Sequence, residues 1–224
     1  MVNSLPTPTE WNAIMQYLED AEIRNEIHTY LIDVDKLTQH SRELIREAIE
    51  EMEGIQADFH SLKISFNTIY LFEQDKHLVY EPDYLFNRYR MITLRSALYN
   101  KFQPLDVQKV RNYCRTKEGE ALKSGLKDDI WSYSSGEKVF GVSEQPGDFT
   151  GKGSSGWKFL ALSQLMADCF FYEKGIFLRR ITPYDNLMFE GKIIQIGQPL
   201  KLKNVQYKRP LINFIARQLK HDLS

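Results

Sequence analysis

The sequence predicts an α+β protein with a long helical N-terminal half, arranged as a helical hairpin or bundle. A mixed C-terminal half with a small β-sheet and a terminal helix follows. Two observations predict this: apolar residues recur at helical spacing through residues 1–126, and after Asp128 the apolar runs become short and β-prone. We therefore expect a mainly helical region at 1–126 and a mixed region at 127–224, with one continuous domain as the alternative.

The first helix is expected to begin near Thr7, because Thr7-Pro8-Thr9-Glu10 fits a capping box. A second, longer helix is expected over residues 21–53, where apolar side chains form one stripe with spacings of three and four. The stripe consists of Ile23, Ile27, Tyr30, Val34, Leu37, Leu44, Ala48, Met52 and Ile55. The apolar face of such an amphipathic helix has to pack against another element, either within the chain or in a second copy. Residues 23–55 are therefore a candidate homo-oligomer surface.

Two readings of residues 58–72 stay open. Helical spacing continues through Phe59, Leu62, Phe66 and Ile69, whereas Leu62, Ile64 and Phe66 alternate as in a strand; we favour the helix. Further helices are expected over residues 84–102, capped by Asp83, and from 105 until weak points at Gly119 and Gly125.

The second half predicts strands and two helices. Residues 130–135 and 137–142 are β-prone and suggest a hairpin, followed by a loop at 143–156 and a helix at 157–171. Residues 175–184 and 191–204 predict strands, and residues 211–223 predict a closing helix.

The composition is that of a folded globular chain. Hydrophobic residues make up 42% of 224 residues, so a substantial core can form. No apolar run is long enough for a transmembrane helix, and the N-terminus has neither the basic nor the apolar region of a secretory signal. The two cysteines, Cys114 and Cys169, lie in apolar segments and are expected to be buried thiols. We therefore expect a cytoplasmic protein without membrane contact.

The formal net charge of −1 hides a strong asymmetry. Residues 1–60 carry 13 acidic and 4 basic side chains, whereas residues 85–117 carry 8 basic side chains and one acidic one, Asp106. Residues 152–224 carry 12 basic and 5 acidic side chains. Such polarity predicts either a charged partner or pairing of opposite charges inside the protein.

The basic segments are candidate nucleic-acid contacts, because arginine and lysine bind phosphates and the interleaved aromatic rings can stack on bases. The candidate residues are Arg88, Arg95, Lys109, Arg111, Arg115, Lys201, Lys203, Lys208 and Arg209. An acidic protein partner could bind to the same surfaces instead of nucleic acid. The alternative is that the acidic N-terminal helix lies against residues 88–117 and neutralises them.

A second candidate is the glycine-rich loop before the helix at 157–171. Its Gly147, Gly151 and Lys152 fail the spacing of a Walker P-loop, but glycine, serine and lysine beside a helix N-terminus favour an anion. Lys152, Ser154 and Ser155 are therefore candidate ligands of a small phosphorylated molecule. The plain alternative is that Ser155 caps the helix.

A third candidate is Glu190-Gly191-Lys192, which resembles the second half of the PD-(D/E)xK nuclease signature. In that chemistry, carboxylates hold a divalent metal and a lysine positions the attacking water. Asp185, or else Asp148, would supply the other carboxylate. A solvated turn at a strand edge is the alternative.

These patterns indicate three possible functions, of which we favour the first. We expect a non-catalytic cytosolic accessory protein that associates through its helical half and contacts nucleic acid or an acidic partner. The alternatives are a Mg²⁺-dependent phosphodiesterase or nuclease that uses Glu190 and Lys192, and a binder of a small phosphorylated ligand at residues 151–156. The five histidines are scattered, so outside the nuclease alternative we expect neither a resident metal nor a cofactor.

Overall fold

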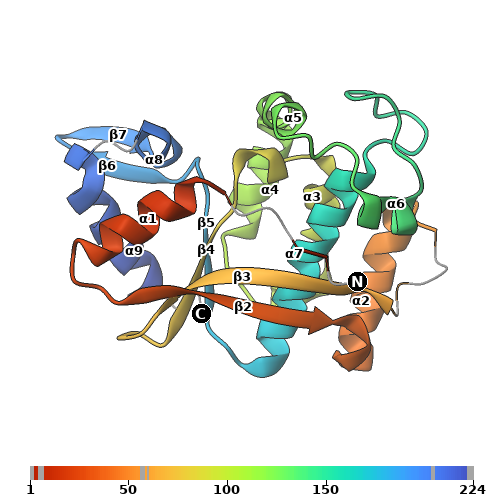
Figure 1. Cartoon of the computed structure of the whole chain (residues 1–224), viewed down its shortest axis with the longest axis horizontal. Coiled ribbons are helices and arrows are strands. Elements are labelled where there is room, and N and C mark those ends of the chain that lie inside the picture. The colour runs from red at the N-terminus through yellow and green to blue at the C-terminus, as the bar shows by residue number, and fades with distance from the viewer. Residues whose placement is uncertain (1–2, 5–7, 56–58, 60, 203–204, 221–224) are drawn as a thin grey trace. The chain divides into compact units, whose positions relative to one another are not determined.

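The computed structural model describes residues 3–4, 8–55, 59, 61–202 and 205–220, and helices and strands intermix along this range (Figure 1). The prediction of a long helical N-terminal half was therefore wrong. Helix α1 (Glu10–Glu19) is followed by strand β2 (Asn25–Asp33), helix α2 (Gln39–Glu51), and strands β3 (Lys63–Leu71) and β4 (Lys76–Tyr80). Within the described residues, no helix is long and apolar enough to cross a membrane.

The expected helix over residues 21–53 is divided into a strand and a shorter helix. Residues 27–32 combine β-branched and aromatic side chains, which favour an extended backbone over the helical spacing that we had followed. Helix α2 begins only after Thr38, whose side chain accepts a hydrogen bond from the Ser41 amide. Leu44, Ala48 and Met52 are buried, so this part of the stripe packs inside the protein. Self-association through residues 23–55 stays a prediction.

Strand β3 settles the open reading of residues 58–72 in favour of the strand over residues 63–71; residues 58 and 60 lie outside the described range. The side chains of Ile64 and Phe66 alternate with more exposed ones, which is the period of a strand. The expected capping box at Thr7 also lies outside the described residues, and the Thr9 side chain makes no capping hydrogen bond.

Strand β3 is central to the five-stranded sheet. It pairs with β2, it is parallel to β1 (Asn3–Ser4) and it is antiparallel to β4. Strand β5 (Leu178–Ile181) adds to β4 in parallel, with Leu78 opposite Arg179. A separate hairpin consists of β6 (Asn186–Phe189) and β7 (Lys192–Gln195).

The chain forms two compact units, each assembled from three segments. Unit 1 comprises residues 1–5, 30–66 and 83–175, and unit 2 comprises residues 6–29, 67–82 and 176–224. The helices of unit 1 are η1 (Val34–Lys36), α2, η3 (Asp83–Leu85), α3 (Arg88–Thr93), η4 (Ala97–Asn100), α4 (Val107–Thr116), α5 (Glu118–Lys127), α6 (Ser134–Phe140) and α7 (Ser155–Lys174). Those of unit 2 are α1, α8 (Gly197–Leu202), η5 (Val205–Tyr207) and α9 (Lys208–Lys220).

Helix α7 is the core of unit 1. Its residues 155–169 are all buried, and it packs against α2, α3 and α6 (Figure 1). An apolar helix of this kind, without a polar stripe, has to be covered on every side. The predicted helix at 157–171 is confirmed and extends by a few residues at each end.

Helix α6 replaces the hairpin that we expected at 130–142. Gly136 explains the difference, because a Cβ atom there would lie 2.3 Å from the carbonyl oxygen of Ser155. The glycine therefore lets a short helix approach the backbone of α7 closely, which a β-prone pattern does not reveal. In unit 2, residues 197–202 form helix α8 where we expected a continuing strand, whereas β5 and α9 confirm the predicted strand and closing helix.

A buried polar network crosses the interior of unit 1. The Tyr99 hydroxyl donates a hydrogen bond of 2.6 Å to Asp168 of α7, and Arg90 Nη1 donates one of 3.3 Å to the same hydroxyl. Arg90 and Asp168 are fully buried. The network thus joins α3, η4 and α7 through groups that all need partners.

We expect Tyr99→Phe to lower the free energy of unfolding by about 1–3 kcal/mol, because it leaves the buried Asp168 carboxylate without this donor. Urea denaturation measures the change. The matched control is Tyr172→Phe on α7, which removes the hydroxyl of a partly exposed tyrosine and should alter the stability by less than about 0.5 kcal/mol. Equal losses in the two variants would contradict the role given to the network.

Unit 2 also buries polar groups beside its strands. The Trp11 indole donates to the carbonyl oxygen of Tyr80, and the buried Arg180 pairs with the buried Glu81 at 3.0 Å. His77 on β4 is buried, with its Nδ1 atom hydrogen-bonded to Thr68 Oγ1 at 2.9 Å. Burial and then the charge of His28 lower the pKa of His77 from 6.5 to about 4, whereas Asp75 acts in the opposite direction.

His77 should make the protein acid-sensitive. Because its folded pKa of about 4 lies below the unfolded value of 6.5, its contribution is complete above pH 6.5 and is lost as the pH falls through that window. Between about pH 7 and about pH 4, the wild type should lose about 3 kcal/mol more stability than His77→Gln. Chemical denaturation at a series of pH values measures this difference, and parallel curves for the two proteins would refute it.

Candidate anion-binding site

Three of the predicted nucleic-acid ligands are engaged inside unit 1. Arg88 binds both carboxylate oxygens of Glu118, through Nε at 2.9 Å and Nη2 at 2.8 Å. Arg95 pairs with Glu51 on the acidic helix α2, and Arg111 donates to the carbonyl oxygen of Leu94. Two charges of segment 88–117 are therefore paired within the unit, Arg95 with helix α2 and Arg88 with Glu118, which directly follows the segment.

The other predicted basic residues are divided between the two units. Lys109 and Arg115 are on α4, where the Lys109 ammonium lies 5.7 Å from the Tyr113 ring centroid. In unit 2, Lys208 pairs with Asp20 at 2.9 Å, Lys201 and Arg209 are exposed, and Lys203 lies outside the described residues. Contact with nucleic acid or an acidic partner stays a prediction.

Within unit 2, Asp185 and Glu190 of the nuclease alternative lie at opposite ends of strand β6. Glu190 and Gly191 form the turn between β6 and β7, with φ angles of 48° and 74°. Asp185, at the other end of β6, accepts a hydrogen bond from the Thr182 amide, while Asp148 bonds to Thr150 in unit 1. In the described part of the chain, no three His, Cys, Asp or Glu side chains are grouped as a metal site would require.

The glycine-rich loop is folded back on itself rather than extended. The Glu144 amide donates to the Gly153 carbonyl, and the Glu144 side chain accepts from the Lys152 amide. Phe149 anchors the middle of the loop, with its ring centroid 5.3 Å from that of Trp131 and 5.9 Å from that of Trp157. The loop thus holds the start of α7 in a fixed environment.

The amides at the start of α7 already have acceptors. Ser154, not Ser155, is the N-cap residue, and its hydroxyl accepts from the Trp157 amide and donates to the Trp131 carbonyl. The Ser155 amide donates to Ser143 Oγ, and the Gly156 amide donates to Trp131. Ser154 and Ser155 are buried. These two predicted phosphate ligands therefore make hydrogen bonds inside the protein.

Beside these amides lies a lysine that the sequence analysis missed. Lys158, in the first turn of α7, is 3% exposed, and its ammonium lies 5.3 Å from the Tyr89 ring centroid and 5.7 Å from that of Phe140. Among the residues that the structure describes, its ammonium forms no hydrogen bond or ion pair. Its cation therefore lies against aromatic faces and has no directly bonded carboxylate among the described residues.

Tyr89 and Lys152 complete the cluster. The Tyr89 hydroxyl accepts a hydrogen bond from the Ser154 amide, which leaves its own proton available for an acceptor. Gly153 is required here, because a Cβ atom would lie 2.1 Å from that hydroxyl oxygen. Lys152 adjoins Gly153, and its side chain runs past Gly141. We call Tyr89, Lys152 and Lys158 the donor cluster.

Comparisons with known proteins give one family. The Family of unknown function (DUF7255) matches residues 47–202. The chain belongs to this family. No curated protein and no solved structure matches the chain. All three residues of the donor cluster lie within the range that the family covers.

The electrostatics of the donor cluster follow from burial. Burial lowers the pKa of Lys158, the charge of Glu53 raises it and the charge of Lys152 lowers it further. Burial also raises the pKa of Tyr89, so the phenol keeps its proton and can donate it. Lys158 is thus influenced by one carboxylate and by a second ammonium group, and an added negative charge beside the two lysines is favoured.

We expect Lys158→Met to stabilise the free protein by about 1–2 kcal/mol, because it removes a buried charge that has no ion pair. Since the pKa of Lys158 is lowered, the folded state releases its proton first as the pH rises. The wild type should then approach the variant in stability towards alkaline pH. Urea denaturation at neutral and alkaline pH measures both effects; a less stable variant would show that Lys158 is a structural ion-pair partner instead.

Proposed function

We propose that unit 1 binds a small phosphorylated ligand through Lys152, Lys158 and Tyr89, without catalysis of its own. The observation that carries the proposal is Lys158, a nearly buried cation that lacks a carboxylate partner within the described residues. Burying an ammonium in this way is unfavourable unless an anion reaches it. A ligand that supplies the missing charge would turn a destabilising feature into a binding one.

The chemistry of the donor cluster suits a phosphate group. Lysine ammonium groups are common phosphate ligands, and a phenol adds a neutral donor to a third oxygen atom. The aromatic rings of Tyr89 and Phe140 around Lys158 would limit water at the bound anion, which strengthens each charged hydrogen bond. The amides of α7 are not needed, because the side chains supply the donors.

We further propose that the protein works in the cytoplasm. Cys114 and Cys169 are both free and buried, which suits a reducing compartment. Burial raises the pKa of Cys169 to about 12, so this thiol stays protonated and unreactive.

Thermal unfolding with phosphate-bearing probes tests the binding proposal. Inorganic phosphate, pyrophosphate, ribose 5-phosphate and AMP are compared with chloride at equal ionic strength. At about 100 times its Kd, a ligand adds about 2.7 kcal/mol, which should raise the Tm of a chain of this size by about 5 °C. Lys152→Ala and Lys158→Met should each lose most of this shift.

The matched control is Lys138→Met, which removes an exposed lysine of α6 in the same unit and should keep the full shift. An equal shift in Lys158→Met and the wild type would contradict the proposal. So would the failure of all four probes to exceed chloride in the wild type.

A further inference from the structure

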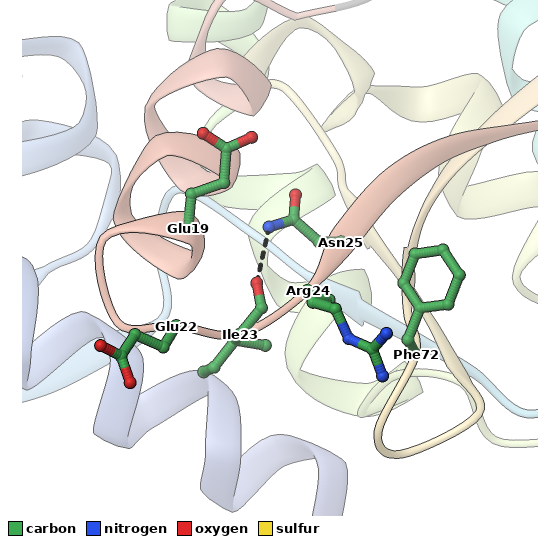
Figure 2. A pocket seen from close by; sticks show the side chains of 6 residues that line it. All are labelled: Glu19, Glu22, Ile23, Arg24, Asn25 and Phe72. Atoms are coloured by element: carbon green, nitrogen blue, oxygen red, sulfur yellow. Dashed lines mark hydrogen bonds between the residues drawn. The ribbon is translucent and has the colours of Figure 1, made fainter.

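Unit 2 has a pocket of about 540 Å³ where α1 leads into β2 (Figure 2). The pocket is open to solvent, and its Arg24 guanidinium already pairs with Glu73 and lies 5.6 Å from the Phe72 ring centroid. The Asn25 amide oxygen in its lining is sealed from solvent. We assign no ligand to this pocket, because its charged side chains are exposed and its buried acceptor cannot be reached.

Lys158 of the donor cluster, by contrast, combines burial with access. Its ammonium forms no hydrogen bond or ion pair with a described residue, yet, unlike the Asn25 oxygen, it is not sealed from solvent. An anion bound at such a group is held away from bulk water, where the interaction between charges is stronger. Charge at the donor cluster should therefore discriminate strongly between ligands.

A further charged group borders the donor cluster at the end of helix α2. The Glu53 amide donates to the Glu50 carbonyl. The next amide, that of Gly54, donates to the Ile49 carbonyl, which completes the hydrogen-bond pattern of a Schellman motif. Glu53 occupies the left-handed position of this motif, with a φ angle of 57°, where glycine is usual. The end of α2 thus fixes the backbone that carries the Glu53 carboxylate.

This end of α2 lies beside the donor cluster. A Cβ atom at Gly54 would be 3.2 Å from Cδ1 of Phe140, whose ring centroid is 5.7 Å from the Lys158 ammonium. Burial is the main cause of the lowered pKa of Lys158 and of the raised pKa of Tyr89, and the charge of Glu53 acts to raise both. The Glu53 carboxylate is exposed and forms no hydrogen bond or ion pair with a described residue, so it remains available to a ligand.

Lys152 approaches the same turn from the glycine-rich loop. Its Cδ and Cε atoms and the Cδ1 atom of Ile55 lie 3.9 and 3.6 Å from the position of a Cβ atom at Gly141. The charges that act on one another here are thus the ammonium groups of Lys152 and Lys158 and the carboxylate of Glu53. A ligand that carries only negative charge would be attracted by the two lysines but repelled by Glu53.

We propose that the ligand of the donor cluster is an aminoalkyl phosphate, that is, a phosphate monoester whose short carbon chain ends in an ammonium group. Lys152, Lys158 and Tyr89 bind the phosphate, and Glu53 binds the ammonium. This ligand class rests on the proposed function and narrows it. A phosphate with two negative charges and one ammonium complements a site with two cations and one carboxylate, whereas a neutral hydroxyl would leave the charge of Glu53 beside the phosphate uncompensated.

Isothermal titration calorimetry at neutral pH with ethyl phosphate and O-phosphoethanolamine tests the proposal, because these probes are of similar size and differ in the ammonium group. The wild type should bind O-phosphoethanolamine at least about tenfold more tightly than ethyl phosphate. Glycerol 3-phosphate, whose hydroxyl groups are neutral donors, should bind like ethyl phosphate. In Glu53→Gln, the preference for the ammonium should fall to about twofold or less, while ethyl phosphate binds at least as tightly as it does to the wild type.

Glu53→Gly is a second variant that suits the left-handed φ angle, and it should lose the preference in the same way. Thermal unfolding verifies that both variants fold. The matched control is Glu47→Gln, which changes an exposed glutamate of α2 and should keep the wild-type preference.

The outcomes separate this proposal from the proposed function. Equal affinity of the wild type for ethyl phosphate and O-phosphoethanolamine would overturn the role of Glu53 and leave phosphate binding intact. The same holds for equal affinity for glycerol 3-phosphate and O-phosphoethanolamine, or for an unchanged preference in both Glu53 variants. Failure of all three phosphate esters to bind would overturn the proposed function and, with it, the aminoalkyl phosphate.

Discussion

The complete burial of helix α7 is the constraint on which unit 1 depends. Because residues 155–169 have no solvent-facing side, the surrounding helices must supply both apolar contacts and partners for each polar side chain on α7. Asp168 accepts a hydrogen bond from the Tyr99 hydroxyl, and the N-terminal amides of α7 donate to the hydroxyls of Ser143 and Ser154 and to the carbonyl oxygen of Trp131. Lys158 is the polar side chain on this helix for which the described residues provide aromatic faces but no anion.

The sequence patterns succeeded where one period was unambiguous. The helix at 157–171, the closing helix as far as Lys220 and the strand around Leu178 follow from long apolar segments or from a short run rich in Ile, Leu and Phe. The patterns failed at the start of the expected helix over 21–53, because Ile27 and Tyr30 fit a helical stripe while the same residues suit strand β2, which is only half covered. Only pairing with β3 decides between the two, and that pairing is a long-range property.

The candidate site shows the same limit. The loop signal at Gly151-Lys152 was visible in the sequence, but Lys158 stands in an apolar helix where the usual interpretation is a lysine at the solvent edge. Its burial arises from Tyr89 and Phe140, which lie on two other helices. The separation of Asp185 from Glu190 likewise follows from the hairpin register, which the Glu-x-Lys spacing alone does not determine.

The assembly of each unit from three segments has a consequence for synthesis. Residues 6–29 belong to unit 2, yet their unit is completed only by residues 176–224. Trp11, Ile14 and Leu18, which are buried in the folded protein, therefore emerge from the ribosome long before their packing partners exist. The nascent chain carries this apolar surface until residues 176–224 have been made, and such transiently exposed hydrophobic surface is the kind that chaperones shield.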